Sequence, residues 1–119
     1  MITCYLAHPL GARTKTRDEL IATLHRADRW RRYLQRTHPD RAFIAPWLDW
    51  AWDAFMGWDR DTPESVILAR CCAWAAAAQE IWLVGDHRSP GMAAEWDACL
   101  ASGGTGNTTW LGTSEPPKD

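Results

Sequence analysis

Residues 81–96, IWLVGDHRSPGMAAEW, contain the pattern that decides the fold. The segment EIWLVG, residues 80–85, is almost entirely apolar, which is typical of a central parallel strand covered on both faces. A charged loop follows, and residues 90–100 then form a predicted helix that closes at Gly103. One acid, Glu95, lies in the first turns of this helix. Glu95 is then either an ordinary exposed helix residue or a reactive group at the mouth of a pocket.

Three further segments have the composition of short strands. They are residues 2–7 (ITCYLA), residues 41–46 (RAFIAP), which end at Pro46, and residues 107–112 (NTTWLG), which we expect at an edge of the sheet. Strands that alternate with helices predict a parallel sheet with helices on both faces. In such sheets ligands bind beyond the carboxyl ends of the strands. We therefore expect a site in the loops that follow CYLA, AFIA and WLVG.

Two more helices are predicted between these strands. The first begins after Thr14 or Thr16, either of which could be its N-cap, and it ends at His38-Pro39. The second covers residues 65–78, SVILARCCAWAAAA, whose alanines favour a helix. The segment TPES at its start indicates a cap with proline at the first helical position.

Tryptophan is unusually frequent, with nine in 119 residues, and five of them fall between Trp47 and Trp74. Large aromatic side chains beyond the needs of a core often indicate a ligand pocket or a subunit interface. A tryptophan-rich core is equally consistent with the sequence. Residues 47–58, WLDWAWDAFMGW, favour a helical turn or a lid that Gly57 breaks.

Length and charge restrict the possible functions. A chain of 119 residues fits one domain with its own core. The net charge of -2 gives no indication of binding to nucleic acid or to an acidic membrane. The basic residues within 26–36 most simply form a solvated helix face. The longest apolar run is too short to span a bilayer, so we expect no membrane partner.

The cysteines indicate the compartment. Cys4, Cys71, Cys72 and Cys99 contain no C-x-x-C pair, and no signal peptide is evident, so we expect a reducing, cytoplasmic location. The four histidines lack the spacing of metal ligands. We therefore expect neither a metal nor another cofactor.

The loops at the predicted sheet edge contain most of the candidate site residues. In chain order these candidates are Tyr5, His8, Pro9, Gly11, Trp47, Asp49, Trp50, Asp53, Ser89, Gly91 and Glu95. Free N–H groups at the start of the last predicted helix favour an anion, such as a phosphate or a carboxylate. Structural explanations stay open for several of them. Glu95, Asp49 and Asp53 could be exposed helix carboxylates, and Ser89 could simply cap a helix. Tyr5 could be a core residue, and His8 could cap a turn.

Two segments resemble the nucleoside 2-deoxyribosyltransferase superfamily. YLAHPLG, residues 5–11, is similar to its Y-L-A-G-P signature, and WLVGDHRSPGMAAE, residues 82–95, is similar to its strand, loop and glutamate-bearing helix. The resemblance is stronger to small, uncharacterised deoxyribosyltransferase-like proteins of bacteria and phages. In these, YLAHP, AFIAPW, WLVG, SPGMAAE and a closing LG recur in this order. The likeness covers residues 2–112, so we expect one domain at residues 1–112 and a mobile tail at residues 113–119.

The resemblance implies a flavodoxin-like three-layer α/β sandwich with a small parallel sheet of four or five strands, assembled as a homodimer or a larger homo-oligomer. It also implies chemistry at the N-glycosidic bond of a nucleoside or nucleotide. Glu95 would be the nucleophile that forms a glycosyl-enzyme, and Tyr5 would orient it. A second base resolves this intermediate in the transferases, and water does so in the N-glycosidases. Ser89, together with the N–H groups of Gly91 and Met92, favours a phosphate contact and hydrolysis.

The sequence departs from the superfamily pattern at three positions. Cys71 and Gln79 stand where the transferases have acids, the first of which protonates the leaving base, and His8 stands at the signature glycine. A cysteine is a poor proton donor to a base because its ordinary pKa is about 8.5. Asp49 and Asp53 are the expected substitutes for the missing acid.

Three functions stay open. The first is an N-glycosidase or 2-deoxyribosyltransferase in which Trp47 and Trp50 stack on the base, while His8, Pro9 and Gly11 contribute to ligand binding. The second is a non-catalytic nucleotide-binding protein that uses the same pocket, such as a sensor or a phage protein that sequesters a signalling nucleotide. The third is an interaction module whose tryptophans bury a subunit interface.

Overall fold

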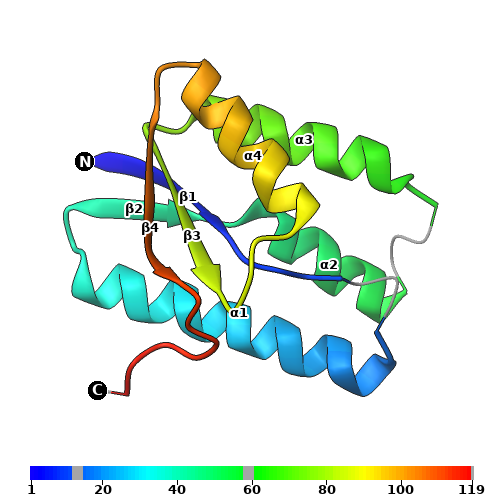
Figure 1. The fold of residues 1–119 in the computed structure, drawn as a ribbon. Coiled ribbons are helices and arrows are strands. Elements are labelled where there is room, and N and C mark those ends of the chain that lie inside the picture. Colours follow the sequence, from blue (N-terminus) through cyan, green and yellow to red (C-terminus); the bar gives the residue numbers. More distant parts are fainter. Residues whose placement is uncertain (12–14, 58–60, 119) are drawn as a thin grey trace.

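The computed structural model describes residues 1–11, 15–57 and 61–118. Strands and helices alternate along the chain (Figure 1). The elements are β1 (Ile2–Ala7), α1 (Arg17–Thr37), β2 (Arg41–Ile44), α2 (Pro46–Met56), α3 (Glu64–Ala77), β3 (Glu80–Gly85), α4 (Pro90–Ala101) and β4 (Thr105–Leu111). The four strands form one parallel sheet in the order β2-β1-β3-β4. The protein is therefore an α/β fold consistent with the predicted flavodoxin-like three-layer sandwich.

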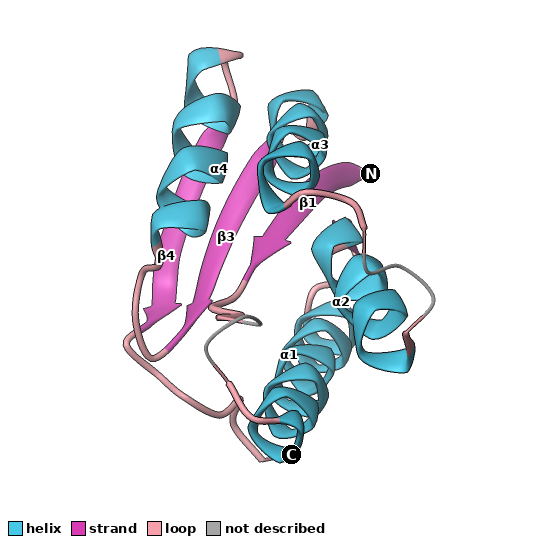
Figure 2. Cartoon of the chain, turned by 90° about the vertical axis from the view of Figure 1, so that its right-hand side faces the viewer, coloured by secondary structure: helices cyan, strands magenta, loops and turns pink. Residues whose placement is uncertain are grey.

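Helices cover both faces of the sheet (Figure 2). Successive side chains of a strand point to opposite faces, and the two buried clusters follow this alternation. Cys4, Leu6, Trp82 and Val84 pack with Trp30 and Leu34 of α1. Tyr5, Ala7, Ile81 and Leu83 belong to the other cluster, together with buried residues of α2, α3 and α4. The strands β1 and β3 are central in the sheet, and helices cover both of their faces. This explains why their sequences are almost continuously apolar.

The element boundaries differ from the predictions in a few places. Residues 41–46 do not form a strand throughout, because β2 ends at Ile44 and Pro46 is the first residue of α2. A proline suits this position, since the first N–H of a helix has no intrahelical partner. The last strand begins at Thr105 instead of residue 107, because Thr105 already pairs with Glu80 of β3.

The helix starts confirm one predicted cap and correct another. The Thr16 side chain accepts a hydrogen bond from the Glu19 N–H and completes a capping box, while Thr14 lies outside the described residues. Pro63 is the N-cap of α3 instead of its first helical residue, and its own side chain makes no capping hydrogen bond. Most of the segment expected to be a turn or lid is the regular helix α2, which ends at Gly57 in a left-handed conformation. Trp58 of that segment lies outside the described residues.

The C-terminal residues contact α1. The Trp30 indole N–H donates to the Ser114 carbonyl at 3.0 Å, and Glu115 forms ion pairs with Arg26 and Arg29. These contacts bring residues 114–115 against α1, and the mobility of the tail stays a prediction. Among the helices of the described residues, none combines the length and the apolar composition needed to cross a membrane.

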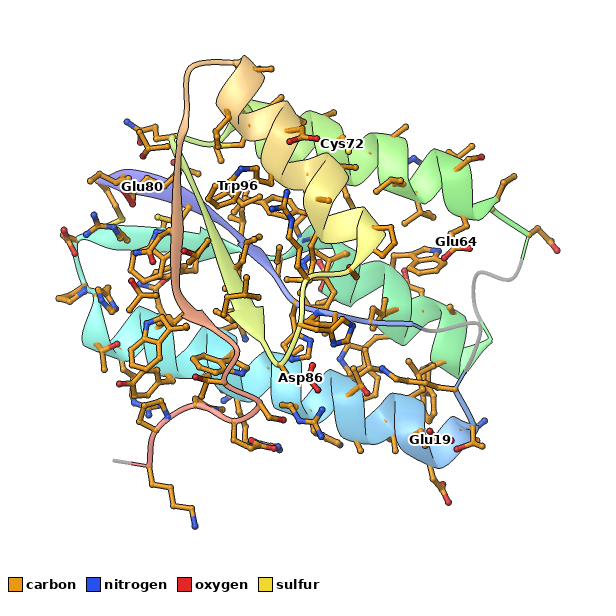
Figure 3. All side chains as sticks on the ribbon, in the orientation of Figure 1. Glu19, Glu64, Cys72, Glu80, Asp86 and Trp96 are labelled. Carbon is orange, nitrogen blue, oxygen red and sulfur yellow. The ribbon has the colours of Figure 1, made fainter. Side chains whose placement is uncertain are left out.

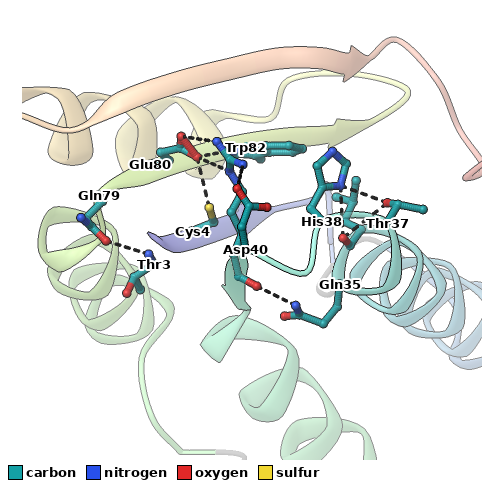
Figure 4. Close-up of polar contacts among 11 residues, drawn as sticks. Thr3, Cys4, Gln35, Thr37, His38, Asp40, Gln79, Glu80 and Trp82 are labelled. Atoms are coloured by element: carbon teal, nitrogen blue, oxygen red, sulfur yellow. Dashed lines mark hydrogen bonds and ion pairs between the residues drawn. The ribbon is translucent and has the colours of Figure 1, made fainter. Parts of the chain in front are cut away.

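A polar cluster lies near the amino ends of the strands (Figure 4). Glu80 accepts a hydrogen bond from the Arg41 guanidinium at 2.7 Å, and also from Cys4 Sγ and Trp82 Nε1. The Arg41 hydrogen bond lowers the pKa of Glu80. These side-chain contacts link the starts of β1, β2 and β3, at the ends of the strands opposite to the candidate site.

Candidate functional site

A cavity of about 470 Å³ lies at the carboxyl ends of the strands, where the topology predicted it. This volume is within the range of small-molecule sites. The wall includes these predicted residues: His8, Gly11, Trp47, Trp50, Ser89, Gly91, Met92 and Glu95. They come from the β1–α1 loop, from α2 and from the start of α4, so the three predicted segments do converge on one pocket.

Glu95 is buried on the cavity wall instead of lying on a solvated helix face. Only 6% of the residue is exposed. The buried residues of α4 are Met92, Glu95 and Cys99, whose spacing is that of one helix face. The sequence of α4 therefore turns this carboxylate toward the sheet. Burial raises the pKa of Glu95 to about 7, although a hydrogen bond from Tyr5 acts in the opposite direction.

Tyr5 lies behind Glu95 in the fully buried part of β1. Its hydroxyl donates a hydrogen bond to Glu95 Oε2. Burial, followed by the nearby charge of Glu95, raises the pKa of Tyr5, so the phenol stays protonated and remains a donor. The Tyr5 side chain thus fixes one carboxylate oxygen of Glu95 and leaves the other for the cavity.

Cys71 also lies on the cavity wall, next to the Tyr5 hydroxyl. Burial raises the pKa of this thiol to about 11. The thiol is therefore neutral at physiological pH and holds its proton too tightly to donate it readily. Cys71 belongs to the apolar lining of the pocket.

His8 has one satisfied and one unsatisfied ring nitrogen. Nδ1 lies 2.6 Å from the carbonyl oxygen of Pro9, whereas Nε2 is buried and has no hydrogen-bond partner among the described residues. The ring stacks on Trp47, with centroids 6.2 Å apart and planes 16° from parallel. Burial lowers the pKa of His8 to about 4, so the imidazole is neutral at physiological pH. His8 therefore caps its own turn and also lines the cavity.

Two tryptophans of α2 form another part of the wall. Trp47 is buried, and its indole N–H donates to the Leu6 carbonyl of β1 at 2.7 Å. This hydrogen bond attaches the start of α2 to the carboxyl end of β1. Trp50 lies one turn further along α2, and its Nε1 is buried without a partner among the described residues. Trp47 therefore anchors α2 to β1 and also lines the cavity, and Trp50 lines the cavity beside it with its Nε1 enclosed.

The start of α4 offers polar groups to the same cavity. Ser89 is the N-cap, and its hydroxyl oxygen accepts a hydrogen bond from the Met92 N–H at 3.2 Å. The structural interpretation of Ser89 as a cap is therefore correct. The serine also lines the cavity, where its hydroxyl hydrogen can still donate. Gly91 lies in the first turn of α4, where the backbone N–H groups have no intrahelical acceptor, and it also lines the cavity.

The remaining predicted residues lie outside the cavity wall. Pro9 is buried beneath β3, where a Cβ on Gly85 would come within 2.7 Å of Pro9 Cδ. Asp49 is exposed and lines a separate hollow beside Asp28. Asp53 is half-buried in a smaller pocket that shares Trp50, Ile67 and Cys71 with the main wall. Neither aspartate lines the main cavity that contains Glu95.

Sequence reasoning missed the contribution of α3. Glu64, the first residue of this helix, lines the cavity together with Ser65 and Leu68. Figure 3 shows Glu64 at the start of α3, on the opposite side of the molecule from Glu80. The TPES segment indicated the start of a helix. That helix follows α2 and does not follow a strand directly, so the rule that places sites beyond strand ends gave no reason to expect Glu64 there. Only the packing of α3 beside α4 brings Glu64 to the pocket.

The tryptophans are divided between core, cavity and surface. Trp30 and Trp82 are core residues, and Trp47 is buried at the cavity. Trp74 of α3 is 53% exposed, and Val66 and Leu68 of the same helix are also exposed. The tryptophans therefore do not share one role: some pack in the core, Trp47 and Trp50 line the cavity, and Trp74 lies on the surface.

Within the part of the chain that the structure describes, no three His, Cys, Asp or Glu side chains are grouped so that they could hold a metal ion. All four cysteines are free thiols. Searches with protein-family models, against curated proteins and against solved structures found no match to this chain.

Proposed function

We propose that this protein acts on the N-glycosidic bond of a nucleoside or nucleotide, as an N-glycosidase or 2-deoxyribosyltransferase with Glu95 as the nucleophile. The observation that carries the proposal is the buried Glu95 carboxylate, which lies on the cavity wall and accepts a hydrogen bond from Tyr5. A group that only solvated α4 would have neither property. The resemblance of YLAHPLG and WLVGDHRSPGMAAE to the superfamily supports the same assignment.

In the proposed reaction, Oε1 of Glu95 attacks the anomeric carbon of the sugar while Tyr5 holds Oε2. The bond from that carbon to the base nitrogen breaks, and its electron pair leaves with the base. Glu64, in its protonated form, gives its proton to the departing base, and its carboxylate later takes up the proton that the attacking water or second base releases. Water or a second base then attacks the same carbon, and the carboxylate of Glu95 leaves unchanged.

The other wall groups fit the parts of a nucleotide. The Trp50 and Trp47 rings offer aromatic surface for a base. The Ser89 hydroxyl and the Gly91 N–H lie at a helix N-terminus, which favours a phosphate. Glu64 takes the place that Asp49 and Asp53 were expected to fill, since Glu64 is the other acid on this wall among the described residues.

A non-catalytic nucleotide-binding protein is the second candidate. It is favoured by Cys71, which stands where the superfamily has its proton donor and which keeps its own proton because burial raises its pKa to about 11. A protein that only binds a nucleotide needs no acid at this position. The same cavity and the same α4 N-terminus would hold the ligand.

One screen separates the two candidates. The wild-type protein is heated with single nucleosides and 5′-monophosphates, in ribo and 2′-deoxy forms, because a ligand of the native state raises its melting temperature. Each stabilising compound is then incubated with the protein at pH 8, and free base is measured by chromatography. Release of base supports the enzyme. Stabilisation without release supports the binding protein, and neither effect with any compound contradicts both.

The homo-oligomer implied by the resemblance belongs to the same proposal. The exposed Val66, Leu68 and Trp74 of α3 are the residues we expect a second copy to cover. Sedimentation equilibrium of the wild type and of Trp74→Ser tests this. A dimer that dissociates in Trp74→Ser supports it, and a wild-type monomer at high concentration contradicts it.

A further inference from the structure

The segment that follows β4, residues 112–115, joins two distant parts of the chain, and we call it the C-terminal strap. Figure 1 shows the chain running from the end of β4 to α1. The Gly112 N–H donates to the Gly85 carbonyl at 2.8 Å, and Thr113 pairs with Gly85 in an antiparallel bridge. Gly85 is the last residue of β3. The strap therefore holds the point from which the β3–α4 loop departs.

The other end of the C-terminal strap is fixed on α1. The Trp30 indole N–H donates to the Ser114 carbonyl at 3.0 Å. Glu115 forms ion pairs with Arg26 and Arg29 at 3.1 and 2.8 Å. Positions 26, 29 and 30 are three and four residues apart, so their side chains share one face of α1. The strap ties this face of α1 to the carboxyl end of β3.

Gly85 is a point where the backbone needs restraint. Its φ is +99°, and glycine restricts the backbone less than any other residue does. Pro9 supplies one restraint, since a Cβ on Gly85 would come within 2.7 Å of Pro9 Cδ. The C-terminal strap supplies another through its backbone contacts with Gly85. Residues 112–115 do not line the cavity, so the strap can be altered without changing the cavity wall.

A charged side chain also links the strap to the β3–α4 loop. Asp86 is the first residue of this loop, and its hydrogen bond with His87 lowers its pKa. The positive charge of Arg26 lowers the same pKa to a smaller extent. Arg26 therefore attracts Asp86 of the loop as well as Glu115 of the strap.

We propose that the C-terminal strap holds the β3–α4 loop in place, and that Glu115 is a positioning residue for the start of α4. Ser89 ends this loop and caps α4, and both Ser89 and Met92 line the cavity. The capping hydrogen bond from the Met92 N–H to the Ser89 hydroxyl therefore depends on where the loop lies. The placement of the loop is independent of the proposed function, and only the choice of nucleotides in the binding test rests on it.

Hydrogen exchange of the full-length, ligand-free protein measures the loop directly. Glu115→Gln keeps the size of the side chain but removes its charge. The amides of residues 86–93 should then exchange about 2- to 10-fold faster, because exposed ion pairs contribute modestly to local stability. The amides of β1 should keep their rates, since only a local opening is expected. The matched control is Asp97→Asn, which removes the same charge from an exposed position of α4 and should leave residues 86–93 unchanged.

A charge exchange tests whether the ion pairs themselves are responsible. Glu115→Arg places a third cation beside Arg26 and Arg29, so it should accelerate exchange of the loop more than Glu115→Gln does. The double variant Arg29→Glu with Glu115→Arg restores a pair of opposite charges and should slow the exchange again. Sodium chloride at about 1 M screens exposed charges. It should therefore accelerate exchange in the wild type more than in Glu115→Gln.

Binding shows whether the placement of the loop matters for a ligand. Calorimetry compares the Glu95→Gln protein, with and without Glu115→Gln, using the 5′-monophosphates of 2′-deoxyadenosine, 2′-deoxyguanosine, 2′-deoxycytidine and thymidine. Each monophosphate that binds should bind about 2- to 10-fold more weakly when Glu115 is changed, because the lost local stability is subtracted from binding. Asp97→Asn in the same protein should leave the affinity unchanged.

The outcomes separate this inference from the proposed function. If the loop exchanges equally in the wild type and Glu115→Gln, or accelerates only together with β1, the inference is wrong whatever the monophosphates do. Equal affinities with and without Glu115→Gln also overturn the positioning role. If the loop alone accelerates and the four monophosphates do not bind, the strap is supported and the result counts against the proposed function.

Discussion

The Tyr5 hydroxyl donates a hydrogen bond to the Glu95 carboxylate, across 90 positions of the sequence. Tyr5 belongs to the central strand β1, and Glu95 lies on the inward face of α4. A carboxylate in this position is costly because it is shielded from water. Burial raises the pKa of Glu95 to about 7. Because of this raised pKa, both the free energy of unfolding and the rate of base release should depend on pH near neutrality.

The first prediction concerns stability. The folded pKa of Glu95 is about 7 and its ordinary value is 4.5, so the folded protein holds this proton more tightly than the unfolded chain does. The stabilising contribution is complete below pH 4.5 and is lost as the pH rises through 7. Relative to Glu95→Gln, the wild type should lose on the order of 2 kcal/mol of unfolding free energy between pH 5 and pH 8. Urea unfolding of both proteins measures this, and parallel pH dependences would contradict it.

The second prediction concerns the pH dependence of base release. Only the ionised carboxylate is a nucleophile, so kcat/KM should rise with pH and level off above a midpoint near 7. In Tyr5→Phe the hydrogen bond that lowers the pKa of Glu95 is absent, so the midpoint should move to higher pH. The pH profiles of both proteins with one nucleotide check this. A midpoint that stays in place in Tyr5→Phe would show that Glu95 is not the titrating group.

Much of the fold could be predicted because it depends on local patterns. The apolar segment EIWLVG and the capping residues Thr16 and Ser89 lie where the sequence placed them. The end of β2 could not be placed from the same rules. A proline is compatible both with the end of a strand and with the start of a helix, and the sequence alone does not decide between these roles for Pro46. In the structure β2 ends at Ile44 and Pro46 begins α2.

The site could be predicted only in part, because packing decides which side chains meet. The i, i+3, i+7 spacing of Met92, Glu95 and Cys99 is present in the sequence and already suggests a buried face. Glu64 could not be found in this way, since its place on the wall depends on how α3 packs beside α4. Asp49 was expected near Glu95, but the turn of α2 places it in another hollow.

The third prediction concerns Gly85, whose φ is +99°. An alanine there would place its Cβ 2.7 Å from Pro9 Cδ, against the loop that carries His8. Gly103 is the matched control, because its φ is +89° but nothing lies within 4 Å of its Cβ position. Gly103→Ala should cost only the backbone strain of about 1–2 kcal/mol, and Gly85→Ala should cost about 1–3 kcal/mol more. Urea unfolding of both variants measures the difference, and equal losses would exclude the contact with Pro9.

The fourth prediction concerns the attachment of α2. Trp47→Phe removes the hydrogen bond to the Leu6 carbonyl and part of a buried ring, so the unfolding free energy should fall by about 1–3 kcal/mol. Met56→Leu changes a side chain that is 51% exposed at the end of the same helix and should alter it by less than about 0.5 kcal/mol. Chemical unfolding at pH 5 compares the two variants. If both lose the same stability, Trp47 is not an anchor of α2.

The most direct measurement is the rate of base release by the wild type and by Glu95→Gln, with a nucleotide that stabilises both proteins against heat. Glutamine keeps the size of the side chain and its hydrogen bond from Tyr5, but its neutral amide cannot attack the anomeric carbon. We predict that the wild type releases free base at pH 8, while Glu95→Gln binds the nucleotide and releases base at least about 1,000-fold more slowly. Equal rates of release in the two proteins would contradict the assignment of Glu95 as the nucleophile.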